Sequence, residues 1–200
     1  MKKVSIIIPT FNYGKYISSA IHSAISQEYS PLEIILIDDG STDNTKTIID
    51  RKYKDRLNYF FQANMGAPAA RNRGIAESEG EYLIFLDADD ALGHDQISSF
   101  ITCAERYPNS LIYCSSIRYI EKDGKTEELY AIDRFEGSDM LDGWLRGWYI
   151  APCCIFWPRG VLENLRGWDE TLLANQDGDL AMRALIHGYN FLFCSCSPQF

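Results

Sequence analysis

The chain has 200 residues, of which 46% are hydrophobic and 24% charged, and its formal net charge is −9 at pH 7. This apolar content predicts a globular domain with a full core and excludes a disordered chain. The acidic balance argues against nucleic acid as the main partner, because phosphate backbones are bound by basic surfaces.

The first half of the chain alternates between strand-like and helix-like patterns. Uninterrupted apolar runs predict four buried strands, at residues 4–8, 32–37, 57–61 and 82–86. Apolar residues spaced by three and four predict helices between them, at residues 17–25, around Ile48 and Ile49, and at 66–78. This alternation predicts an α/β fold, in which a mostly parallel sheet carries helices on both faces.

The second half of the chain changes character. A long strand is expected at residues 111–120, followed by a hairpin turn at Asp123-Gly124 and a return strand at 126–130. Helices are expected at residues 138–146, from Pro158 onwards, and at 177–187. Since no flexible linker or repeat interrupts the chain, we expect one domain over residues 1–200, with a smaller mixed α+β region at its back.

The cysteines and the apolar runs bear on location. The six cysteines are not spaced as zinc ligands, and we interpret Cys153-Cys154 and Cys194 with Cys196 as small apolar side chains within strands. No run approaches the ~20 apolar residues that a membrane span needs. The apolar run after Lys2-Lys3 is too short for a signal peptide. A reducing, cytoplasmic location is therefore expected.

Polar residues follow three of the predicted strands, at Pro9-Thr10-Phe11-Asn12, Asp38-Asp39 and Asp87-Ala88-Asp89-Asp90. The carboxyl ends of parallel strands meet at one edge of a sheet, where ligands bind, so these residues predict one site. Carboxylates this close repel one another, and a divalent metal is the simplest partner for them. From these residues alone, a solvated acidic loop remains equally open.

Several segments together carry a resemblance to a known family. They are Ser5 to Asn12, Ile37 to Asp43, Asn64 to Gly66 with Ala70 to Gly74, Gly80 to Asp90, Gly167 to Glu170, and Gln176 to Arg183. In this order they resemble the family 2 glycosyltransferases, which have the GT-A fold, a doubly wound α/β architecture. The resemblance implies a nucleotide-diphospho-sugar donor, a divalent metal (Mn²⁺ or Mg²⁺), and inversion at the anomeric carbon. It assigns residues 1–92 to the nucleotide-sugar-binding half and residues 93–200 to the acceptor side.

The resemblance also implies roles for single residues. It places Pro9, Thr10, Phe11 and Asn12 in the first nucleotide-binding loop, Asp39 at the base (most often uracil), Arg71 in the nucleotide pocket, and Asp87, Ala88 and Asp89 in the D-x-D motif. The metal is expected on Asp89, with Asp87 and Asp90 in support. Asp177 matches the general base, although Gln176 stands where many members have Glu. Trp168, Asp169 and Trp148 are weaker candidates for acceptor contacts.

Simpler interpretations exist for two of these acids. Asp39 and Asp177 each lie where a residue that only caps the following helix would lie, and alone that is the simpler interpretation. The chemistry favours Asp177 as base, because an acceptor hydroxyl must lose its proton and a helix N-terminus keeps a carboxylate ionised. Arg71 is expected to make a bidentate phosphate contact.

Two other functions bind similar ligands. A nucleotidyltransferase would usually show a Gly-rich basic loop after the first strand, and here that loop is Asn12-Tyr13-Gly14-Lys15. A non-catalytic nucleotide-sugar-binding protein is disfavoured by the presence of Asp177.

The resemblance further implies a hexosyltransferase acting on a glycan or lipid-linked acceptor in polysaccharide or cell-envelope synthesis, with peripheral association at the inner face of the membrane. The Gln-x-x-Arg-Trp motif of processive members is absent, so a non-processive enzyme is expected. Family members commonly continue with a segment that closes over the donor, so we expect the chain to be truncated at its carboxyl end.

Overall fold

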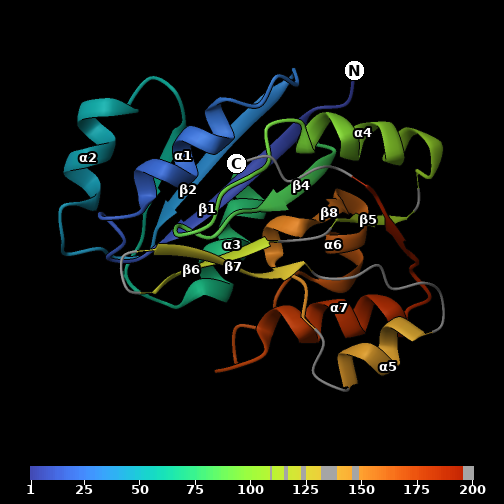
Figure 1. Cartoon of the computed structure of the whole chain (residues 1–200). Helices are drawn as coiled ribbons and strands as arrows, with labels where there is room; N and C mark the ends of the chain where they lie inside the picture. The colour runs from blue at the N-terminus through green and yellow to red at the C-terminus, as the bar shows by residue number, and fades with distance from the viewer. Residues whose placement is uncertain (109, 115–116, 123–124, 132–138, 146–148, 196–200) are drawn as a thin grey trace.

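A seven-stranded β-sheet runs through the computed structural model, which describes residues 1–108, 110–114, 117–122, 125–131, 139–145 and 149–195 (Figure 1). The strand order is β3-β2-β1-β4-β8-β5-β9. The bounds are β1 Val4–Thr10, β2 Leu32–Asp38, β3 Asn58–Phe61, β4 Tyr82–Phe85, β5 Leu111–Tyr113, β8 Ile155–Pro158 and β9 Phe191–Phe193. Neighbouring strands are parallel except that β8 runs antiparallel to both β4 and β5.

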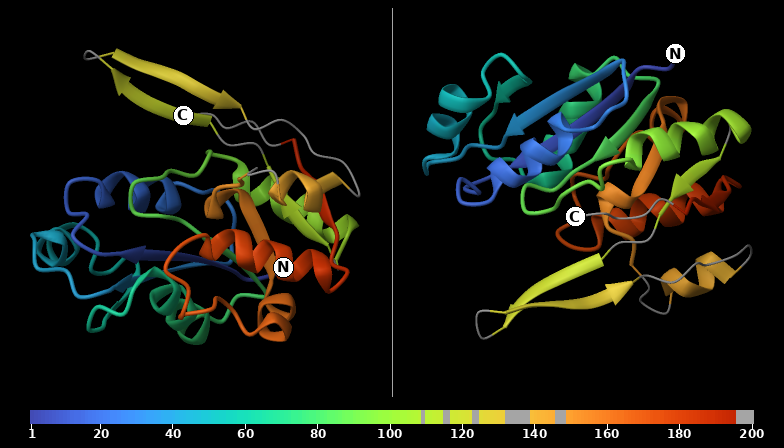
Figure 2. Two further views of the ribbon diagram at one scale, coloured as in Figure 1. Left: turned by 90° about the horizontal axis from the view of Figure 1, so that it is seen from below. Right: turned by 45° about the horizontal axis from the view of Figure 1, so that its top comes forward.

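Helices cover both faces of this sheet, as predicted. Their bounds are α1 Ile17–Ile25, α2 Thr45–Lys52, α3 Ala67–Glu77, α4 Gln96–Arg106, α5 Asp139–Leu145, α6 Arg159–Leu165 and α7 Gln176–Ile186. Figure 2 shows α1 and α3 on opposite sides of β1. A separate hairpin of β6 (Ile117–Lys122) and β7 (Lys125–Ala131) projects from the body of the molecule in the same figure.

The core follows from the apolar runs that predicted it. Every residue of β1 is buried, because helices pack on both faces of this central strand. Gly74 allows α3 to approach the sheet closely, since a Cβ atom there would meet Cγ2 of Ile7 at 2.3 Å. Cys153, Cys154 and Cys194 are buried as expected, but Cys153 and Cys154 lie in a short 3-10 helix (Pro152–Cys154) and Cys194 just after β9, not within strands. Cys114 is also buried, Cys103 is half-buried, and Cys196 lies outside the described residues.

The strand order reverses at β1, which has β2 on one side and β4 on the other. Such a switch point opens a crevice at the carboxyl ends of the strands. Here β4 pairs with β1 only over Val4 to Ile7, whereas β2 pairs with it as far as Thr10. The strand can therefore continue through Pro9, whose missing N–H would face the side where β4 has ended. The last residues of β1 therefore lie at this switch point.

The second half departs from the sequence-based expectations in three places. The single strand expected at residues 111–120 is divided into β5 and β6, which belong to different sheets. The helix α4 and the antiparallel strand β8 were not predicted. The hairpin is confirmed by the pairing of Lys122 with Lys125, although its turn at 123–124 lies outside the described residues.

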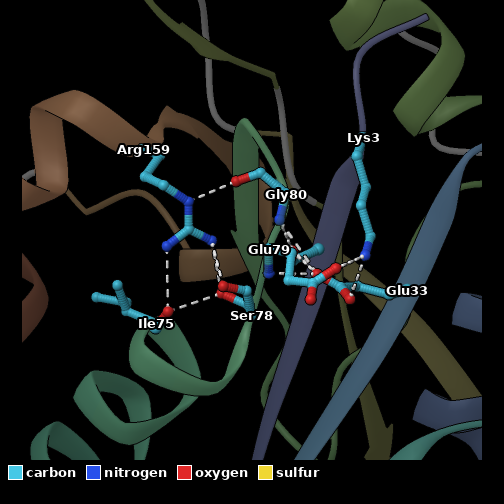
Figure 3. Close-up of polar contacts among 8 residues, drawn as sticks. Lys3, Glu33, Ile75, Ser78, Glu79, Gly80 and Arg159 are labelled. Atoms are coloured by element: carbon cyan, nitrogen blue, oxygen red, sulfur yellow. Dashed lines mark hydrogen bonds and ion pairs between the residues drawn. The ribbon is translucent and has the colours of Figure 1, made fainter.

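The amino-terminal edge of the sheet is closed by a polar network (Figure 3). Glu33 on β2 accepts hydrogen bonds from the amides of Glu79 and Gly80 and pairs with Lys3 at 2.9 Å. Arg159, the first residue of α6, donates to the carbonyl oxygens of Gly80 (2.6 Å), Ser78 and Ile75. These bonds join the end of α3 and the start of β4 to the second half of the chain.

Candidate active site

The carboxylates after β4 lie on a turn. The strand ends at Phe85, and the amide of Asp90 donates to the carbonyl oxygen of Asp87 at 3.0 Å, so the chain folds back at once. Ala88 is buried, Asp87 and Asp90 are half-buried, and Asp89 is exposed. Asp87 and Asp89 therefore follow the predicted strand, but they lie on a turn and not on its extended continuation, because pairing with β1 stops at Phe85.

Arg71 joins two acids that are far apart in the sequence. Its side chain is only 5% exposed, and Nη2 donates to Oδ1 of Asp87 at 2.7 Å. Nη1 lies 3.4 Å from Oδ1 of Asp177, at the start of α7. The structure thus brings together Arg71, Asp87 and Asp177, three residues that the sequence proposed for one site. It also gives both terminal nitrogens of Arg71 carboxylate neighbours, rather than leaving them free for a phosphate.

Asp177 is largely desolvated. Its side chain is 21% exposed, and burial raises the pKa of its carboxyl group above the usual aspartate value. The charge of Arg71 and a 3.1 Å hydrogen bond from Nε1 of Trp168 act in the opposite direction on the same pKa. A carboxylate with an elevated pKa is a stronger proton acceptor than an ordinary aspartate when it is ionised.

The two loops after β1 and β2 are bonded to each other. Asn12, in the left-handed region with φ 58°, accepts hydrogen bonds from the amides of Thr42 and Asp43, and its own amide donates to Ser41. The left-handed backbone turns the Asn12 side chain toward the second loop, a conformation that asparagine tolerates. Neighbouring Phe11 is 43% exposed, beside this joined surface.

Asp39 has a structural partner set that the sequence did not suggest. Its carboxylate accepts hydrogen bonds from Gln62 (2.7 Å) and from the amides of Met65 (2.9 Å) and Gly66 (2.8 Å). It does not cap α2; it fixes the loop that leads into α3. Only 3% of Asp39 is exposed, so contact with a base stays a prediction that competes with this network.

Thr10, at the end of β1, is 4% exposed, and its hydroxyl has no hydrogen-bond partner among the described residues. Nε of Arg71 is also buried and has no hydrogen-bond partner among the described residues. Buried polar atoms in folded proteins are nearly always paired, so unpaired ones at the carboxyl ends of strands point to a ligand that completes them.

Two tyrosines near the acids escaped the sequence analysis. The charges of Asp89 and Asp87 are among the causes that raise the pKa of Tyr13, so its hydroxyl lies near the turn after β4. Burial, followed by the charges of Asp177 and Asp87, raises the pKa of Tyr149. Tyr13 lies in the loop after the first predicted strand, which is the signal that could have found it, whereas Tyr149 lies in no recognisable motif.

The three residues expected to contact the acceptor differ in their exposure. Trp168 is 4% exposed and packs edge-on against Phe85 with ring centroids 4.3 Å apart, so its ring is not an open stacking surface. Asp169 is exposed and accepts hydrogen bonds from the amide and hydroxyl of Thr171. Trp148 lies outside the described residues. A pocket of about 440 Å³ lies instead beside Asp177, lined by Tyr149 and residues 173–178.

The carboxylates can be tested as ligands of the implied divalent metal. No group of three or more potential ligands is arranged to hold a metal within the described part of the chain. Asp87 is engaged by Arg71, and Oδ2 of Asp90 lies 3.7 Å from Sγ of Cys153. Asp89 is exposed, and no ion pair or hydrogen bond engages its side chain among the described residues. One such carboxylate fits a metal whose remaining ligands come from a diphosphate and water, a common arrangement for Mg²⁺.

Solved structures share this fold. TarS from S. aureus (residues 1–349) superposes with a TM-score of 0.76 at 20% identity, covering 98% of this chain and 58% of that one. The mannosyltransferase PcManGT from Pyrobaculum calidifontis, in complex with GDP-Man and Mn²⁺, gives 0.70 at 20% identity, covering 96% and 55%. The chain therefore has the GT-A fold, as the resemblance implied.

Sequence comparison defines the family. The description "Glycosyl transferase family 2" matches residues 5–166, and the chain belongs to this family. An uncharacterised glycosyltransferase of Rickettsia typhi is 34% identical over 189 residues, covering 91% of this chain and 58% of the relative. The uncharacterised glycosyltransferase YibD of Escherichia coli is 36% identical over 149 residues, covering 72% and 43%. The chain thus spans about half the length of these relatives.

The structure also bears on membrane spans. Among the described residues, no helix combines the length and the apolar character that crossing a bilayer requires.

Proposed function

We propose that this protein is an inverting glycosyltransferase that moves a sugar from a nucleotide-diphospho-sugar to an acceptor hydroxyl, with Asp177 as the general base. The observation that carries the proposal is that Arg71 forms ion pairs with both Asp87 and Asp177. It sets a desolvated carboxylate of raised pKa beside the turn that carries Asp89. Donor and acceptor chemistry thereby share one crevice.

The donor end of the site is the crevice between β1 and β4. The hydroxyl of Thr10 has no hydrogen-bond partner among the described residues, and a nucleotide diphosphate would supply one. The exposed carboxylate of Asp89 would hold the metal that the diphosphate carries. A divalent metal, when bound through Asp89 and the diphosphate, would neutralise the charge that develops on the leaving oxygen. Asp90 and Asp87 support the turn that positions Asp89.

The acceptor end is the pocket beside Asp177. The acceptor oxygen attacks the anomeric carbon while the bond from that carbon to the diphosphate oxygen breaks, and the acceptor proton passes to the carboxylate of Asp177. Attack on the face opposite the leaving group inverts the anomeric centre. The departing electrons remain on the nucleoside diphosphate.

The finer assignments rest on similarity. TarS has been crystallised with UDP and with UDP-GlcNAc, and PcManGT with GDP-Man and Mn²⁺, which supports a nucleotide-sugar donor and, for uridine, the expected base. We extend the proposal to a hexosyl donor, non-processive transfer, a glycan or lipid-linked acceptor, and action at the cytoplasmic face of a membrane.

A panel of nucleotide sugars with Mn²⁺ tests the proposal, by titration calorimetry for binding and by product analysis for transfer. We expect metal-dependent binding of UDP that disappears in Asp89→Ala and on chelation of the metal. Asp55→Ala removes another exposed carboxylate, in the turn between α2 and β3, and should bind normally. Binding by Asp89→Ala equal to wild type, or no donor bound or cleaved by the wild type, contradicts the proposal.

A further inference from the structure

The two groups that approach Asp177 do so at the same oxygen. Nη1 of Arg71 lies 3.4 Å from Oδ1, and Nε1 of Trp168 donates to Oδ1 at 3.1 Å. No ion pair or hydrogen bond engages Oδ2 among the described residues. A carboxylate that takes a proton needs one unengaged oxygen, and the pocket lined by residues 173–178 is where an acceptor hydroxyl would meet it.

Trp168 is itself held firmly. The side chain of Asn72 accepts a hydrogen bond from the Trp168 amide (2.9 Å) and donates one to its carbonyl oxygen (2.9 Å). The indole ring packs against Phe85 and lies 6.5 Å from the ring of Trp157. The position of its Nε1–H is therefore fixed by α3 and β4.

Arg71 is held from three sides. Asp87 binds one terminal nitrogen, Asp177 lies at the other, and the guanidinium lies 5.6 Å from the Trp168 ring centroid, within cation–π range. Adjacent residues of α3 thus determine both contacts of Oδ1, because Arg71 makes one itself and Asn72 holds Trp168, which makes the other. This arrangement links the turn after β4 to the start of α7.

We propose that Arg71 and Trp168 are positioning residues that hold Oδ1 of Asp177, so that Oδ2 faces the acceptor pocket and takes the acceptor proton. The inference rests on the proposed function. It replaces the phosphate contact expected for Arg71 and the acceptor contact expected for Trp168 with a single task, the orientation of the base.

The two roles of Arg71 predict different kinetics. A phosphate contact acts on the donor in its ground state, so its loss raises the donor KM and weakens UDP binding. A positioning residue acts on the reacting geometry, so its loss lowers kcat and leaves the donor KM near the wild-type value. Arg71→Met should show the second pattern, and Arg71→Lys, which keeps the charge, should recover part of the lost kcat.

Trp168→Phe removes the Nε1–H and keeps an aromatic ring. We expect kcat to fall about 10- to 100-fold, the range for one hydrogen bond to a charged group, with UDP binding unchanged. Trp157→Phe is the matched control, because Trp157 is a buried member of the same aromatic cluster and makes no hydrogen bond to Asp177 among the described residues. It should lower the melting temperature by a similar amount and leave kcat near wild type.

Three outcomes would overturn the inference while the wild type is active. These are a kcat of Trp168→Phe equal to that of Trp157→Phe, a weakened UDP affinity of Arg71→Met at unchanged kcat, and no recovery of kcat by Arg71→Lys over Arg71→Met. Absence of transfer by the wild type with every donor overturns the proposed function instead, and this inference with it. The Arg71 variants keep the test decisive if Trp168→Phe does not fold.

Discussion

An arginine lies at each end of the strands of the central sheet, which we call the amino-terminal and carboxyl-terminal edges. One arginine binds neutral oxygens and the other binds carboxylates. At the amino-terminal edge, Arg159 donates to three carbonyl oxygens and to the hydroxyl of Ser78 (Figure 3). At the carboxyl-terminal edge, Arg71 faces two carboxylates and keeps a buried Nε without a partner among the described residues.

The difference separates bonds that stabilise the fold from the group of residues for which we propose a function. The N–H groups of Arg159 are hydrogen-bonded to neutral carbonyl oxygens at and just after the end of α3. Its positive charge also interacts favourably with the dipole at this helix C-terminus. Around Arg71, acids outnumber the cation, and Asp177 has a raised pKa because it is buried. Unpaired atoms and like charges are costly in a folded protein, and they concentrate where a ligand completes them. Variants at the two edges should therefore fail in different ways.

Asp177→Asn should have the largest effect, at the carboxyl-terminal edge. Without a base, transfer should fall about 10²- to 10⁴-fold, whereas metal-dependent UDP binding should persist. The melting temperature should hold or rise, because a desolvated charge is removed. Kinetics, calorimetry and thermal unfolding on one preparation check this. Loss of UDP binding together with transfer would falsify the role of Asp177 as base.

The pH dependence of the wild type sharpens the same point. Because burial raises the pKa of Asp177, the acidic limb of kcat should lie above the pH at which an ordinary aspartate titrates. The carboxylate must be ionised to accept a proton, so kcat falls as the pH drops through this pKa. A profile flat down to the ordinary aspartate pKa contradicts it.

Arg159→Met should reverse the pattern, at the amino-terminal edge. Carbonyl oxygens of α3 and of the turn before β4 lose a charged donor, and unfolding free energy should drop by about 2–4 kcal/mol. Transfer per folded molecule should remain. Urea unfolding compared with Arg56→Met, which removes an exposed arginine, measures the difference. Equal stability of the two variants would contradict the stabilising role of Arg159.

Gly80→Ala tests how closely the amino-terminal edge is packed. A Cβ at Gly80 would lie 2.6 Å from the Ser5 amide nitrogen and 2.8 Å from the Tyr82 carbonyl oxygen, and backbone cannot move aside easily. A loss of about 1–3 kcal/mol is expected. Gly160→Ala is the control, because nothing lies within 4 Å of its Cβ and alanine favours the helix. A Gly80 variant as stable as the Gly160 variant contradicts the packing.

Glu33→Gln should have the smallest effect, and it depends on pH. Burial opposes ionisation of Glu33, but hydrogen bonds from Lys3, Ser5 and the Glu79 amide outweigh it and lower the pKa of its carboxyl group. A lowered pKa in the folded state gives stability above the unfolded-state pKa, and this stability is lost as the pH falls through the folded-state value.

We therefore expect Glu33→Gln to lose about 1 kcal/mol at neutral pH and the difference from wild type to shrink in acid. Thermal unfolding as a function of pH measures it, with the exposed Glu163→Gln as control. A difference that grows on acidification has the wrong sign.

Local patterns foretold the first half of the molecule well. The apolar runs that became β1, β2 and β4 are buried on both faces, so their sequences carry no polar alternation and are unambiguous. The polar residues after these strands lie at the carboxyl ends of neighbouring strands, because β1, β2 and β4 are parallel. The second half was harder: α4 was missed, and β5 was fused with β6, because short strands give little periodicity.

The sequence by itself determined the alternating α/β order of the first half and predicted which acids would follow its strands, because each is a property of a few neighbouring residues. Only the tertiary structure decided that Arg71 bridges Asp87 and Asp177, that Trp168 donates to Asp177, and that Asp39 fixes a loop. Asn72 and Trp168 are 96 positions apart, and their contact exists only once the sheet has closed. Hydrogen-bond partners at such separations are set by packing, and no local pattern encodes them.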